Sequence, residues 1–298
     1  MNGLLIFLST VFFCLNSTMT RLFQVNVENG KGIIRIYQAA FCLTAAMLNM
    51  LLYGICQIKL GSLVLSVLFG ALFAAASYLC SVCYECGPMS LTSVIVNLSL
   101  AIPLIYSSAV YGEKIAIHRI PGLGLLAVTF VLSAKSGEKN GEKYTSVSRK
   151  WMFLVSLAFA ANGVTAILQK ENQLKFGETA GHMFLTVAYF VGAGAFAAIY
   201  IIERKIHNMH IRPSGGEFKS IPLFVLTAVL AGAGSILGNG ILGMLSTKVN
   251  SAILYPCVNG GLAVMTAMIS VIIFKEKITK LKFVSVIVGV AAIILLAI

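Results

Sequence analysis

Long apolar runs alternate with short polar breaks along the whole chain. Each run is long enough to cross about 30 Å of hydrocarbon as a helix. The runs do not show the strict apolar–polar alternation of membrane barrel strands. The pattern predicts ten transmembrane helices, at 3–20, 33–56, 61–84, 88–111, 115–134, 151–168, 182–202, 221–243, 251–274 and 281–298.

The composition supports this interpretation. Of the 298 residues, 58% are hydrophobic and 11% are charged, and the mean hydropathy is +0.93. A soluble domain carries about 25% charged residues, so these few charges cannot cover a water-exposed surface. So apolar a chain does not stay disordered either. We therefore expect an all-α integral membrane protein with membrane lipid around most of its surface.

The net charge of +12 comes from Lys and Arg residues that lie mostly between the apolar runs. They form no continuous stripe, so we expect no nucleic-acid partner. Most of them fall in the breaks that follow spans 1, 3, 5, 7 and 9. The positive-inside rule places these loops in the cytoplasm and both termini outside. The first run lacks signal-peptide features and is expected to remain as a helix. The short loops are compatible with the plasma membrane of a bacterium.

The two halves of the chain repeat one another. Asn16 in span 1 matches Asn162 in span 6, and phenylalanines precede both at the same spacing. The Glu-Lys-Ile at 113–115 recurs at 276–278, after spans 4 and 9. An odd number of spans per half inverts the second half, which is the architecture of many secondary transporters.

This repeat predicts the domain organisation. A first five-helix repeat covers residues 1–134 and a second covers 151–298, joined by a linker loop at 135–150. The expected fold is therefore ten transmembrane helices arranged as two inverted five-helix repeats.

Four short motifs occur in a characteristic order. They are Arg35 near the start of span 2, Pro103 within span 4, Gly112-Glu113 at its end, and Glu276-Lys277-Ile278-Thr279 followed by Gly289-Val290. Together they resemble the drug/metabolite transporter (DMT) superfamily, EamA type. The resemblance implies ten helices in two repeats and movement of a solute across a membrane. Members similar to this chain carry amino acids, nucleobases, sugars, drugs and other metabolites.

The chain departs from that pattern in two places. Lys275 stands where a second Gly-Glu would have glycine, and span 7 has no arginine matching Arg35, with only His182 near that place.

Polar side chains within the spans are candidate substrate-binding groups, because they are costly in hydrocarbon unless they face protein or water. Amides both donate and accept hydrogen bonds and so suit a polar, uncharged or zwitterionic solute. Bonding between helices is the alternative role for each. The candidate substrate-binding residues are Asn16, Arg35, Tyr106, Asn162, Tyr189, Asn239 and Asn259.

Arg35 has two further interpretations. Its side chain could extend to the membrane surface, or it could pair with a carboxylate. Asn97 is another amide within span 4. Pro103 and Pro256, in the equivalent spans 4 and 9, predict either a kink or an interrupted helix of the kind that marks transporter binding sites. Gly234 and Gly238 predict close helix packing in span 8.

Catalytic and metal-binding patterns are weak. The sequence shows no nucleophile with a base in reach, so we expect no enzyme activity and no cofactor. Cys80, Cys83 and Cys86 share one helical stripe. A closed zinc site needs four ligands, and no fourth is evident, so no metal is expected.

The expected function is a secondary transporter that moves a small polar metabolite or drug-like solute by alternating access. The alternative is a non-transporting membrane scaffold or partner-binding subunit. Either a monomer or a homodimer is compatible with ten helices.

Overall fold

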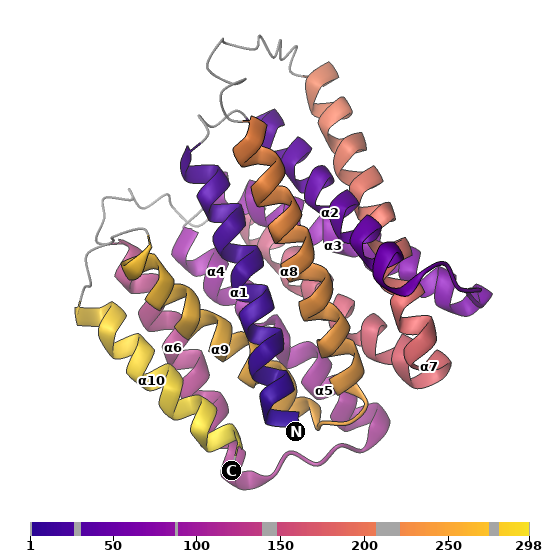
Figure 1. The fold of residues 1–298 in the computed structure, drawn as a ribbon. Helices are drawn as coiled ribbons and strands as arrows, with labels where there is room; N and C mark the ends of the chain where they lie inside the picture. Colours follow the sequence, from indigo (N-terminus) through magenta and orange to yellow (C-terminus); the bar gives the residue numbers. More distant parts are fainter. Residues whose placement is uncertain are drawn as a thin grey trace.

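A computed structural model describes residues 2–26, 31–86, 89–138, 148–206, 221–273 and 280–297. Every regular element in these ranges is helical (Figure 1), which confirms the all-α prediction. The elements are α1 (Asn2–Asn26), α2 (Lys31–Tyr53), α3 (Leu60–Cys86), α4 (Met89–Asn97), η1 (Leu98–Leu100), α5 (Ala101–Tyr111), η2 (Ile117–Arg119), α6 (Ile120–Glu138), α7 (Arg149–Ile206), α8 (Ile221–Ser246), α9 (Ser251–Ile272) and α10 (Lys280–Ala297).

Eight helical segments of the described chain are long and apolar enough to cross a membrane. Two shorter apolar helices, Ile120–Leu132 and Phe283–Leu296, fall on the fifth and tenth predicted spans. These lengths and compositions fit a membrane protein.

The break predicted at 170–177 begins too early, because the helix continues through 170–176. Lys170 and Glu171 are buried there and paired with partners from other parts of the chain, so the charges do not end the helix. The backbone leaves the helical conformation only at Gly177 (φ 80°, ψ −179°). Gly177 therefore divides α7 into a first segment, Arg149–Gly177, and a second segment, Gly181–Ile206.

The fourth predicted span is not one continuous helix. The 3-10 turn η1 separates α4 from α5. Pro103 has no N–H with which to bond the carbonyl four residues earlier, which is in η1. Gly112 then ends α5 in the left-handed conformation, with φ 65°. Residues 112–116 are not helical, so α6 begins several residues later than the predicted start at 115.

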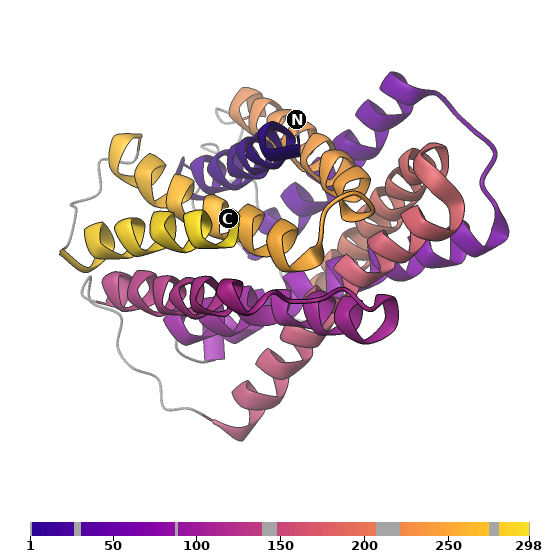
Figure 2. The same cartoon turned by 90° about the horizontal axis from the view of Figure 1, so that it is seen from below.

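Helices from before residue 135 pack against helices from after residue 150. The strongest contacts pair α1 with α8, α2 and α3 with α7, and α6 with α10. Figure 2 shows α10 beside α6 and α1 beside α8. The two ends of the chain lie at the same end of the bundle (Figure 1). We refer to it as the terminal end.

The apolar core lies among α1, α2, α3, α8 and the second segment of α7. Phe23 and Tyr37 stack there with ring centroids 4.1 Å apart. Asn49 ties α2 to α7 by donating to the backbone oxygen of His182 and to Thr186 Oγ1, both at 2.7 Å.

Glycines allow α8 to approach its neighbours closely, as predicted. A Cβ added at Gly234 would lie 2.5 Å from the backbone oxygen of Phe12 and 2.9 Å from the backbone nitrogen of Asn16. The backbones of α1 and α8 are therefore nearly in contact at this point. A Cβ added at Gly238 would likewise lie 3.1 Å from the ring of Phe13.

Part of the repeat motif lies outside the described residues. This applies to Glu276, Lys277, Ile278 and Thr279, and to 139–147 of the predicted linker.

We expect Gly234→Ala to lower the free energy of unfolding by about 1–3 kcal/mol, because the new methyl group must displace a backbone. Gly240→Ala is the matched control in the same helix, since nothing lies within 4 Å of its Cβ position. The control should stabilise the helix by up to about 1 kcal/mol. Thermal unfolding of both variants in detergent measures the difference, and equal melting temperatures would contradict the close contact.

Candidate functional site

A cavity of about 260 Å³ lies between helices of the two halves. Its polar lining consists mainly of amide side chains, carried by α1, α4, α7, α8 and α9. These amides are Asn16, Asn97, Asn162, Gln169, Asn239 and Asn259. Four of them belong to the predicted substrate-binding set. We call this space the amide cavity.

Tyr189 does not line the amide cavity itself but bonds two residues that do, Ser235 and Asn239. It is 2% exposed, and its hydroxyl accepts a hydrogen bond of 3.0 Å from Asn239 Nδ2 while also bonding Ser235 Oγ. Its position fits a role in orienting Asn239. Arg35 and Tyr106, the other two predicted residues, do not line the amide cavity.

Gln169 was not in the predicted set, although the sequence held a signal for it. It follows Asn162 by two helical turns, so both side chains lie on one face of α7. Thr165 and Ala166 line the cavity between them. Because Lys170 directly follows Gln169, the predicted span ended at residue 168. Gln169 was therefore not recognised as part of the same helix face as Asn162.

Asn16 and Asn162 each reach across to the other half of the chain. Asn16 Nδ2 donates to the backbone oxygen of Ala231 at 2.9 Å, and Asn162 Nδ2 donates to Ser99 Oγ at 2.7 Å. The two residues that match in the sequence repeat therefore both join the halves at the amide cavity.

The interrupted span contributes directly to this site. Asn97, Ser99, Leu100 and Pro103 all line the cavity from the junction of α4, η1 and α5. Polar groups of the fourth span therefore lie in the lining at this junction. Pro256 in turn lies inside a continuous α9, so the ninth span is not interrupted in the same way.

Aromatic rings also line the amide cavity. Phe13, Phe41, Phe69 and Phe73 all come from α1, α2 and α3. Phe73 packs edge-on against Phe41, with ring centroids 6.3 Å apart, and parallel to Phe69 at 6.4 Å. The lining therefore combines aromatic rings with amide groups.

A network around Lys170 joins three helices one helical turn from the cavity, toward the terminal end. Lys170 is 3% exposed. Its Nζ bonds Ser107 Oγ at 3.0 Å and Ser251 Oγ at 2.8 Å, and it forms an ion pair with Glu113. Glu113 also accepts a hydrogen bond of 2.7 Å from the backbone nitrogen of Ser251. The network ties the end of α5 to α7 and α9.

Tyr106 belongs to a neighbouring group centred on Glu171. The Tyr106 hydroxyl donates to Glu171 Oε1 at 2.6 Å, and Tyr111 donates to the same oxygen. Lys175 Nζ lies 2.7 Å from Glu171 Oε2. Tyr106 therefore fixes a carboxylate at the terminal end.

Arg35 lies toward the opposite end and is buried, so it does not extend to the surface. Its Nε lies 3.5 Å from Glu203 Oε2 of the second segment of α7. Its Nη1 donates to Gln38 and Ser81, both at 3.2 Å, and its guanidinium lies over the ring of Tyr78 at 4.8 Å. Of the alternatives for Arg35, the structure shows pairing with a carboxylate.

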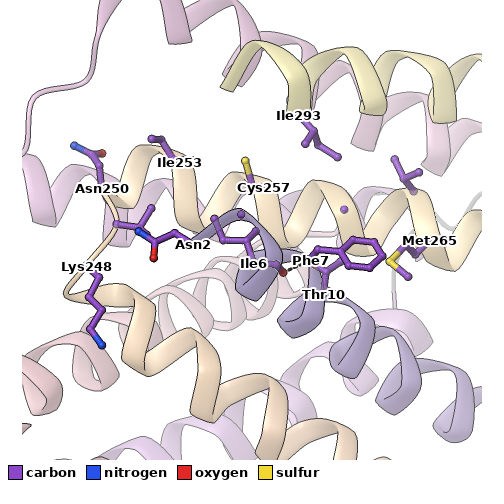
Figure 3. A pocket seen from close by; sticks show the side chains of 14 residues that line it. Asn2, Ile6, Phe7, Thr10, Lys248, Asn250, Ile253, Cys257, Met265 and Ile293 are labelled. Atoms are coloured by element: carbon purple, nitrogen blue, oxygen red, sulfur yellow. Dashed lines mark hydrogen bonds between the residues drawn. The ribbon is translucent and has the colours of Figure 1, made fainter. Parts of the chain in front are cut away.

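A larger cavity of about 650 Å³ lies between α1, α9 and α10 (Figure 3). Asn2, Lys248 and Asn250 gather toward one end of it, while Phe7 and Met265 lie toward the other. Because most of its lining is apolar, this space offers a polar solute fewer hydrogen-bonding groups than the amide cavity does. Among the described residues, no three His, Cys, Asp or Glu side chains are grouped so as to hold a metal ion.

Comparisons with known proteins bear on the fold alone. No family model and no curated protein matches the sequence. Solved structures do match: one described as "Crystal structure of protein" aligns with a TM-score of 0.70 at 9% sequence identity, over 97% of this chain and 98% of that one. Another protein of nearly the same length therefore shares this helical architecture.

The pKa of Glu113 explains how the Lys170 network should respond to pH. Burial opposes ionisation of Glu113, but hydrogen bonds from Lys170 and Ser251 outweigh burial and lower the pKa of its carboxyl group. A lowered pKa stabilises the fold above the ordinary value of about 4.3, and this stabilisation is lost as the pH falls through the lowered value.

We expect Lys170→Met to lower the free energy of unfolding by about 3–5 kcal/mol at neutral pH, because Glu113 would keep its charge without a cation. The double variant Lys170→Met, Glu113→Gln should recover most of this loss. Lys175→Met, at a 64% exposed side chain, is the control and should change little. Thermal unfolding from neutral pH to below pH 4 measures these effects. A single variant as stable as the wild-type protein would contradict the network.

Proposed function

We propose that this protein is a secondary transporter of a small polar solute, and that it works by alternating access between two inverted five-helix repeats. The observation that carries the proposal is the amide cavity, which draws its polar lining from both halves of a bundle of membrane-length helices. In lipid, polar side chains gathered around a cavity mark a solute pathway.

The packing of the helices supports the inverted repeat. Counting α4 with α5 as one span and the two segments of α7 as two gives ten spans. In such a repeat, each of spans 1–5 is equivalent to the span five places later. The equivalent of the packed pair of spans 1 and 8 is then the pair of spans 6 and 3. Those spans also pack, through Ser62 Oγ and Asn172 Oδ1 at 2.6 Å. The pairs 2–7 and 5–10 are each their own equivalent, and both are in contact.

The charged groups support alternating access. Glu113 and Lys170 join the two halves toward the terminal end, and Arg35 and Glu203 join them toward the other end. Alternating access requires the halves to separate at one end while they stay joined at the other. Ion pairs that cross the two halves are suitable contacts for this exchange, because water can replace each partner when an end opens.

We further propose that the chain is a transporter of the EamA type of the drug/metabolite transporter superfamily and that it lies in a bacterial plasma membrane. Arg35, Pro103 and Glu113, three of the residues behind the resemblance, lie at a cross-half ion pair, at the cavity and in the Lys170 network. A membrane scaffold would need none of these features.

Flux from proteoliposomes tests the proposal. Protein-containing vesicles are loaded with a mixed metabolite extract, with and without a pH gradient. They should lose one class of compound selectively when compared with loaded vesicles that contain no protein. Mass spectrometry identifies what leaves. No selective loss from demonstrably folded protein would overturn transport and favour the scaffold.

Variants of the amide cavity sharpen this test. Asn162→Ala and Asn16→Ala should each slow the selective flux by about tenfold, the effect of one lost hydrogen bond. Asn26→Ala is the matched control, because Asn26 is exposed at the end of α1. Unchanged KM and maximal rate in both cavity variants would exclude these residues from the site.

A further inference from the structure

The amide groups of the cavity are held in one orientation by their hydrogen bonds. Backbone oxygens accept hydrogen bonds and cannot donate them, so an amide next to one must turn its nitrogen toward it. Asn16 bonds the oxygen of Ala231 at 2.9 Å, and Asn259 bonds that of Tyr255 at 2.9 Å.

Two further amides of the lining are held in the same way. Asn239 Nδ2 donates to the backbone oxygen of Ser235 at 3.0 Å, and Gln169 Nε2 donates to that of Asn239 at 2.7 Å. Exchanging the oxygen and nitrogen of any of these four side chains would set two acceptors against each other. Their orientation is therefore determined by the fold.

This arrangement leaves the four amide oxygens available. Within the described residues, the hydrogen bonds of Asn16, Gln169, Asn239 and Asn259 use their nitrogens, and no side-chain or backbone donor is bonded to their oxygens. A carbonyl oxygen has two lone pairs, and leaving it unpaired in a dry site is costly. The wall of the cavity thus offers acceptors that a bound solute can satisfy.

In the part of the chain that the structure describes, no charged side chain lines the amide cavity. Lys170 is the nearest cation along α7, directly after Gln169, but its ammonium group is engaged with Glu113, Ser107 and Ser251. A carboxylate or phosphate would therefore meet amide oxygens without a compensating cation, and its desolvation would be unfavourable.

The aromatic part of the lining favours a flat solute. The rings of Phe13, Phe41, Phe69 and Phe73 all line the cavity. The face of an aromatic ring carries partial negative charge, so it attracts N–H groups and cations as well as other rings. A flat solute that stacks on a ring and carries N–H groups would suit both the rings and the amide oxygens.

We propose that the amide cavity selects a small, flat solute that donates hydrogen bonds from clustered N–H groups, and that it rejects anions. The role of this selectivity in transport rests on the proposed function. The binding preference itself does not, because it follows from the orientation of the four amides and the absence of a lining cation among the described residues.

Three probes of nearly identical shape test the proposal. Benzamidine carries only N–H donors on its planar head group, benzamide carries both donors and an acceptor, and benzoate carries acceptors alone. Titration calorimetry of the purified protein in detergent should show benzamidine and benzamide binding at least about tenfold more tightly than benzoate, the worth of one unmatched polar contact. Benzoate binding as tightly as the two donors, or no binding of either donor, would overturn the proposal.

Variants connect the preference to the amide oxygens. Asn259→Leu removes one oxygen at nearly constant volume and should weaken benzamidine binding by about tenfold. Gln169→Met is a second variant that keeps the side chain unbranched. Asn26→Leu is the matched control, because Asn26 makes the same bond to a carbonyl one turn earlier, at 2.8 Å, but is exposed. Unchanged binding in both cavity variants would contradict the proposed recognition.

The binding and flux experiments fail independently. Selective binding of donors without any flux would sustain this inference and overturn transport. Selective flux of carboxylates would sustain transport and overturn this inference.

Discussion

A hydrocarbon solvent offers no hydrogen bonds, and this constraint organises the polar residues of the bundle. In water, an asparagine or lysine can point in almost any direction from a helix. In lipid, it must face a partner, and partners are found where helices meet. The polar side chains of this chain accordingly gather in a few places, at the amide cavity and in the ionic groups toward either end. Apolar and small residues occupy much of the remaining helix surface.

The cavity lining and the Lys170 network are neighbours along the same helices. Gln169 lines the cavity, and the next residue, Lys170, anchors the network toward the terminal end. Along α5 and α9, the step from the cavity to this network is one helical turn, from Pro103 to Ser107 and from Tyr255 to Ser251. A change of contacts at Lys170 would therefore move cavity-lining atoms through rigid helix, without an intervening loop.

The sequence predicted the location of most helices well, because a run of apolar residues long enough to span lipid has few other stable conformations. It also singled out Asn16, Asn162, Asn239 and Asn259 as candidate substrate-binding residues, since amides are rare and costly in such runs. The structure brings these four residues around one cavity. The grouping of Lys170 with Glu113 was not predictable in this way. A charge in an apolar run resembles the end of a helix unless its partner is known, and that partner lies in a different span. Arg35 and Tyr106 were likewise identified as polar residues within spans, but their carboxylate partners depend on tertiary packing that no local pattern shows.

The junction within α7 places two partners of the ionic contacts on one continuous piece of chain. Lys170 lies on the first segment and Glu203 on the second, and only Gly177 departs from helical geometry between them. Its φ of 80° with an extended ψ is accessible almost exclusively to glycine. Gly177 is therefore the one residue between the two ionic contacts at which the backbone of α7 changes direction. A rotation there would change the angle between the two segments, and with it the position of Lys170 relative to Glu203.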